Sequence, residues 1–148
     1  MKEAEQLIYA RLIGDTEATN GLLALLGDAT HIMHAFQVAV PEVPYLTYQV
    51  YSNGKGELGG NFGRSLDLFI QFNAYARSAM IPDVIARLRK LFDGYRFDVP
   101  GNYTDVGQLR GVFDFEGPDG YDESLEAETK QVRYRFFVTP KAWNPITA

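Results

Sequence analysis

The chain has 148 residues with 14 Lys and Arg, 19 Asp and Glu, and no Cys, which gives a formal net charge of −5. With 46% hydrophobic and 22% charged residues, residues 1–148 can bury a core as a single domain, which excludes an intrinsically disordered chain. The lack of Cys excludes disulfides, thiol nucleophiles, Cys-ligated zinc and iron–sulfur clusters. The N-terminal residues lack a signal-peptide pattern, and no apolar run approaches the roughly 18 residues of a membrane span, so we expect neither export nor a membrane partner.

Charge is distributed unevenly along the chain. Residues 105–128 contain eight acids and one base, whereas residues 129–148 contain four bases and no acid. A net acidic chain with one small basic cluster lacks the broad electropositive surface that binding to phosphates requires, so we expect no sequence-specific nucleic-acid binding. An acidic segment beside a basic one instead suits a contact between subunits of opposite charge.

The first third of the chain predicts two helices and one short strand. Apolar residues in the segment 7–12 form one stripe among good helix formers. After a break at Gly14, Thr16 is expected to cap a second, short helix that contains residues 22–26. Residues 32–36 then indicate a short extended segment.

Four longer segments alternate between apolar and polar residues, and they are residues 45–51, 64–75, 108–116 and 130–139. One apolar and one polar face is typical of antiparallel strands that are covered on one side. In the third of these strands, the apolar face is expected to hold Leu109, Gly111, Phe113 and Phe115.

Residues 78–93 predict an amphipathic helix that ends at Gly94. The expected order of elements is helix, helix, short strand, strand, strand, helix, strand, strand. The economical solution is an α+β fold, a two-layer sandwich in which helices pack on one face of an antiparallel or mixed β-sheet. The other face of this sheet is then available to a partner.

A glycine-rich segment, residues 53–63, joins the first two long strands and contains five Gly. It predicts a long β-hairpin with a mobile tip. Lys55, Leu58 and Phe62 lie on this tip, where an apolar side chain either anchors in a partner's pocket or folds back onto the edge of the sheet. The glycine spacing does not match a phosphate-binding loop.

The sequence offers no pattern of residues for catalysis or metal binding. His31 and His34 are the only histidines, and without a helical metal motif or a nucleophile elbow they are more typical of partly exposed polar residues. The acidic run 114–123 fails as an EF-hand loop, because Pro118 stands where a ligand is required and Asp119 stands where Gly is required. We therefore expect no catalytic residue, no metal and no cofactor.

Several local sequences, taken in order, match a known pattern. They are the strand segments 44–49 and 66–76, the helix end 88–94, the loop with Pro118, Asp119, Tyr121 and Asp122, and the terminal strand segment 132–138. Together they resemble the tail-completion, or head-to-tail joining, proteins of long-tailed bacteriophages and prophages, which are related to tail terminator proteins.

This resemblance implies a non-enzymatic structural protein of the virion, located in the neck after assembly in the host cytoplasm. It implies a ring of identical subunits, typically a hexamer, that completes the tail and contacts head connector or adaptor proteins and the tail tube protein while DNA passes through. On this interpretation Asp119, Asp122 and Glu123 belong to a subunit contact with Arg133 and Arg135 of the next copy.

Two alternatives stay open at this point. One is a small α+β protein-interaction module outside a virion. The other is an enzyme or ligand-binding domain, which should show a deep pocket lined by convergent polar groups.

Overall fold

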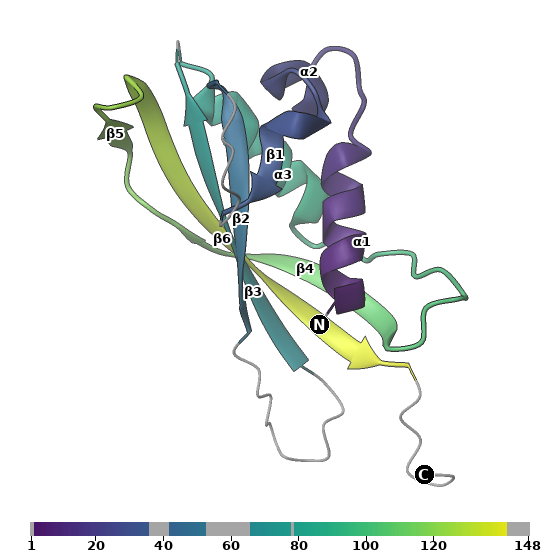
Figure 1. The fold of residues 1–148 in the computed structure, drawn as a ribbon. Coiled ribbons are helices and arrows are strands. Elements are labelled where there is room, and N and C mark those ends of the chain that lie inside the picture. Colours follow the sequence, from purple (N-terminus) through teal and green to yellow (C-terminus); the bar gives the residue numbers. More distant parts are fainter. Residues whose placement is uncertain (1, 36–41, 53–65, 78, 142–148) are drawn as a thin grey trace, which may run out of the picture.

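The computed structural model describes residues 2–35, 42–52, 66–77 and 79–141, and Figure 1 shows their arrangement. Three helices pack against one face of a six-stranded mixed sheet. The strands follow the order β1-β2-β3-β6-β4, and β5 pairs separately with β6. The predicted α+β fold with two layers is confirmed.

The long elements lie close to where the sequence places them. The helices are α1 (Lys2–Ile13), α2 (Leu22–Leu26) and α3 (Ile81–Phe92), and a 3-10 turn, η1 (Ala29–His31), follows α2. The strands are β1 (Ile32–His34), β2 (Tyr45–Ser52), β3 (Leu66–Ala76), β4 (Val106–Glu116), β5 (Gly120–Asp122) and β6 (Ala127–Pro140). β1 runs parallel to β2, and every other named pair of strands is antiparallel.

The core forms around an aromatic cluster between α3 and the centre of the sheet. Phe92, at the end of α3, is fully buried, and its ring centroid lies 5.5 Å from Phe72, 5.8 Å from Tyr134 and 5.6 Å from Phe136. Such ring pairs contribute about 0.5–1.5 kcal/mol each beyond the burial of their area. The alternate residues Val132, Tyr134, Phe136 and Val138 of β6 are all buried, so the predicted alternation of this strand is confirmed.

The end of β4 departs from the predicted alternation. The register of β4 against β6 shifts between Phe113 and Phe115, which marks a β-bulge. Phe113 packs against the core, whereas Phe115 is 45% exposed. The prediction that Phe115 shares the buried face is wrong, because one extra residue in a strand reverses the faces of those that follow.

The starts of two helices also differ from the prediction. Thr16 does not cap α2, which begins at Leu22; instead the Asp15 carboxylate accepts a hydrogen bond from the Leu22 N–H at 2.8 Å. α3 begins at Ile81 with Pro82 in its first turn, where the missing N–H of proline removes no helical hydrogen bond.

Candidate functional site

No described helix covers the face of the sheet opposite α1, α2 and α3 (Figure 1). We call this surface the open face. In the strand register, Tyr51 lies opposite Phe69, Phe69 lies opposite Arg135, and Arg135 lies opposite Val112, so one row of side chains crosses four strands. The open face is defined by the following residues: Tyr51, Asp67, Phe69, Gln71, Arg110, Val112, Arg133, Arg135 and Phe137.

Two arginines lie among aromatic rings on the open face. The guanidinium carbon of Arg135 is 4.5 Å from the ring centroid of Phe137 and 5.7 Å from that of Phe69. The guanidinium carbon of Arg133 is 5.6 Å from the centroid of Phe69 and 5.4 Å from that of Phe115. These distances fall within the range of cation–π contacts, and arginine with aromatic residues is the composition enriched at protein–protein interfaces.

The same arginines also pair with carboxylates of their own chain. Arg133 Nε donates to Asp114 at 2.7 Å, and Arg135 donates to Asp67. Their side chains are 41% and 40% exposed, so each pair contributes about 1 kcal/mol or less. The contact of Arg133 and Arg135 with acids of a second subunit stays a prediction, and their intramolecular partners reduce the free positive charge they would bring to it.

The acidic residues singled out from the sequence lie in and before the turn between β5 and β6. Asp119 accepts a hydrogen bond from Lys130 at 2.9 Å. Asp122 accepts hydrogen bonds from the Ser124 hydroxyl at 2.7 Å and the Leu125 N–H at 3.0 Å, and these bonds lower its pKa. Two of the three expected contact acids therefore already have partners within their own chain.

Glu123 differs from the other two acids, because it is exposed and no residue of the described chain pairs with its carboxylate. The predicted tip residues Lys55, Leu58 and Phe62 lie outside the described residues. β2 and β3, which flank that segment, pair up to Ser52 opposite Leu68.

One buried ion pair was not anticipated from the sequence. Arg87 of α3 donates to both carboxylate oxygens of Asp15 at 2.6 and 2.5 Å, and only 11% and 5% of their side chains are exposed. Burial acts to raise the pKa of Asp15, but the hydrogen bonds from Arg87 and Leu22 outweigh it and hold this pKa below its ordinary value. The partners are 72 positions apart, so no local pattern could have revealed the pair.

A second unanticipated contact fastens α1 to the start of β4. The carboxylate of Glu3 accepts hydrogen bonds from the backbone N–H groups of Thr104, Asp105 and Val106 at 2.9, 2.8 and 3.0 Å. Desolvation acts to raise the pKa of Glu3, and these bonds together lower it. Both unexpected carboxylates thus join elements of the fold.

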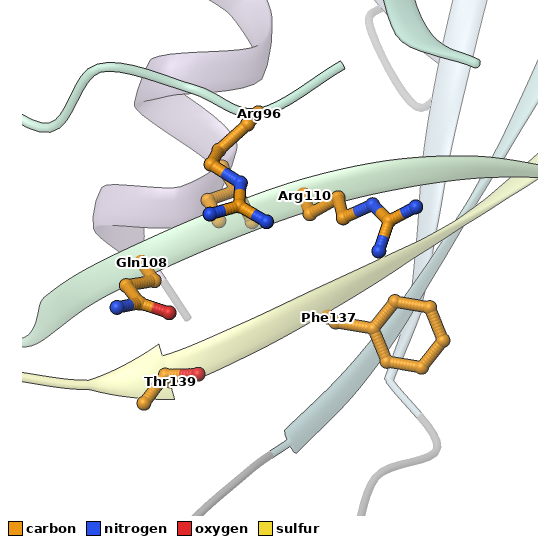
Figure 2. A pocket seen from close by; sticks show the side chains of 6 residues that line it. Arg96, Gln108, Arg110, Phe137 and Thr139 are labelled. Carbon is orange, nitrogen blue, oxygen red and sulfur yellow. The ribbon is translucent and has the colours of Figure 1, made fainter. Parts of the chain in front are cut away.

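Two grooves open at the ends of the open face. The first has a volume of about 310 Å³ and lies at the β4 edge, where Figure 2 shows Arg96, Gln108, Arg110, Phe137 and Thr139 around it. The second, of about 330 Å³, lies beside β5 and is lined by residues that include Asn73, Tyr75, Tyr121, Asp122 and Lys130. The first groove presents guanidinium, amide and hydroxyl groups, which are hydrogen-bond donors suited to an anion.

The described residues form neither a metal-binding cluster nor a membrane-spanning helix. No three His, Asp or Glu side chains of the described residues gather in a group that could hold a metal ion. None of the described helices has the length and hydropathy needed to cross a membrane.

Comparison with known proteins reveals a likeness of structure. Neither a protein-family model nor a curated protein matches the sequence. A chain in a solved structure described as "Virion of native gene transfer agent (GTA) particle" superposes with a TM-score of 0.66 at 13% sequence identity. The match covers 92% of this chain and 97% of that chain. The two chains therefore share a fold over nearly their whole lengths.

Proposed function

We propose that this protein is a structural component of the virion of a long-tailed phage or a related particle. In this role it forms a ring, of hexameric type, at the head–tail interface, where it completes the tail and joins it to the head. Its partners are further copies of itself, the head connector or adaptor proteins and the tail tube protein.

The observation that carries this proposal is the full-length likeness to a chain of a gene transfer agent virion. Because almost all of both chains takes part, the likeness concerns a whole subunit and not a small shared motif. The sequence resemblance to tail-completion proteins supports the same role independently. The open face, with its arginine and aromatic residues, provides a surface of the composition that subunit contacts use.

The proposed role is structural and not enzymatic. The fold holds the pKa of three of its carboxylates, those of Glu3, Asp15 and Asp122, below the ordinary value, because each accepts several hydrogen bonds. A general acid requires a shift in the opposite direction. These side chains act as hydrogen-bond acceptors that join helices, strands and turns.

Deletion of the gene in the strain that encodes the protein tests this role. We expect filled heads and separate tails by negative-stain electron microscopy, and joined particles again when the wild-type gene is supplied in trans. Mass spectrometry of purified wild-type particles should detect the chain. Joined, infectious particles from the deletion strain, or particles without the chain, would support the interaction-module alternative instead.

A further inference from the structure

Two arginines lie directly opposite each other at the β4 edge of the open face. The chain after α3 runs beside β4, where Arg96 and Arg110 form an antiparallel bridge and the Phe97 N–H donates to the Leu109 carbonyl at 2.8 Å. Both arginines are exposed, and Figure 2 shows their side chains beside the same groove. Like charges placed directly opposite on paired strands repel each other. An anion between them would remove this repulsion.

The described residues do not supply this anion. Within the described residues, neither Arg96 nor Arg110 has a carboxylate partner, in contrast to Arg133 and Arg135. Gln108 and Thr139 line the same groove and add further donors, so a carboxylate could accept several hydrogen bonds there. Arginine donates two parallel hydrogen bonds to a carboxylate, so two neighbouring arginines form a specific binding site for carboxylates.

Unpaired carboxylates are present elsewhere on the molecule. Glu123, Glu126 and Glu128, in and after the turn that joins β5 to β6, are all exposed and have no cationic partner among the described residues. Arg77 binds this turn through the backbone carbonyls of Leu125 and Glu126, and not through a carboxylate. We call this segment the acidic turn.

We call the groove lined by Arg96, Gln108, Arg110, Phe137 and Thr139 the arginine groove. The arginine groove and the acidic turn of one chain lie too far apart to meet. In the strand register Arg110 lies opposite Phe137 of β6, whereas Tyr121 of β5 lies opposite Glu128. Phe137 lies nine positions after Glu128 along β6, which corresponds to about 30 Å. Figure 1 shows β5 and the C-terminal end of β6 at opposite ends of the sheet.

We infer that the arginine groove of one copy binds the carboxylates of the acidic turn of a second copy. Because donor and acceptor surfaces differ and lie at opposite ends of the molecule, the contact is head-to-tail and can repeat around a closed ring. The inference rests on the proposed function, since it names the subunit contact of the proposed ring. A carboxylate of a second copy is favoured over a nucleic-acid phosphate, because the net charge of −5 opposes binding to DNA.

Site-directed crosslinking tests this contact directly, because the chain contains no Cys. One variant carries Gln108→Cys in the groove and a second carries Ser124→Cys in the acidic turn. After mixing and treatment with a short bis-maleimide, we expect mixed dimers in clear excess over dimers of either variant alone. At about 1 mM protein even a contact with a Kd of about 1 mM is substantially populated, so the absence of mixed dimers there overturns the inference.

Neutral variants test whether charge carries the contact. R96Q/R110Q removes the groove's charge, and E123Q/E126Q/E128Q removes that of the acidic turn. Each variant should raise the dissociation constant between copies about tenfold or more at low salt, with a smaller effect at high salt. Mixed together, the two variants should form a 1:1 dimer that does not grow, because each contributes one intact surface. K2Q/K90Q, which changes the net charge as much as R96Q/R110Q but on the helical side of the molecule, is the matched control and should associate like the wild type.

The outcomes separate this inference from the proposed function. If electron micrographs show rings but the groove-to-turn crosslink does not form, the inferred contact is overturned while the proposed ring stands. The crosslink without particles that contain the chain would support the contact and count against the virion role. Loss of binding to a short DNA duplex in R96Q/R110Q, with unchanged self-association, would assign the groove to phosphate and overturn the inference. An unchanged unfolding midpoint of both neutral variants is required for each comparison.

Discussion

At the scale of single residues, the carboxylate of Asp15 shows that the stability of the fold depends on contacts between positions far apart in the sequence. It caps α2 through the Leu22 N–H and pairs with Arg87 of α3 in a site where both side chains are nearly buried. Removing one partner of a buried ion pair leaves an uncompensated charge, which costs more than the pair itself contributes.

We expect Asp15→Asn to lower the free energy of unfolding by about 3 kcal/mol at neutral pH, measured by urea denaturation. The pKa of Asp15 is lowered in the folded state, so its contribution is present above the ordinary pKa of an aspartate, about 3.9. It is lost as the pH falls through the folded pKa, so the difference between wild type and variant should shrink below about pH 4.

The exposed Asp98→Asn is the matched control and should change stability by about 0.5 kcal/mol or less. Two results would contradict this prediction: Asp15→Asn unfolds like the control, or its loss in free energy of unfolding persists unchanged in acid. Either result would mean that the ionised carboxylate of Asp15 does not stabilise the fold.

At the scale of secondary-structure elements, periodicity determines what can be predicted. The strands β3 and β6 alternate over many residues, so their positions and buried faces follow from the sequence. β5 has only three residues and no detectable period, and the bulge near Phe115 depends on pairing with β6. Of the three glutamates of the acidic turn, only Glu123 was singled out from the sequence. Arg96 and Arg110 were not anticipated, because only the bridge between their strands brings them together.

Gly111 of β4 lies where the strand passes close to α3 and β6. A Cβ atom at this position would approach the Phe92 carbonyl oxygen and the Phe136 ring to 2.8 Å. We expect Gly111→Ala to destabilise the protein by roughly 1–3 kcal/mol, because neither the backbone nor the packed ring can move away freely.

Gly101→Ala supplies the comparison, because a Cβ there meets nothing within 4 Å. Thermal unfolding of the two variants should differ clearly, with Gly101→Ala close to the wild type. Equal midpoints would mean that β4 does not pack as tightly against α3 as these contacts require.

At the scale of the whole molecule, the fold divides into a layer that holds it together and surfaces that remain for partners. The helical layer and the aromatic core around Phe92 account for the internal packing, and the long β3–β6 ladder spans the molecule. The open face, the arginine groove and the acidic turn contribute little to that core. Changes that weaken assembly should therefore be separable from changes that weaken folding.

Deletion of residues 55–61, within the glycine-rich segment 53–63, tests this separation. The described pairs of β2 with β3, from Tyr45 opposite Tyr75 to Ser52 opposite Leu68, do not include the deleted residues. We therefore expect the variant to unfold with the wild-type midpoint but to join heads and tails poorly, measured as the titre and the fraction of joined particles in a complementation assay. A deletion of equal length within β3 should abolish folding and serves as the contrast. An unfolded variant would place these residues in the folding unit, and full infectivity would remove them from the surface that joins head to tail.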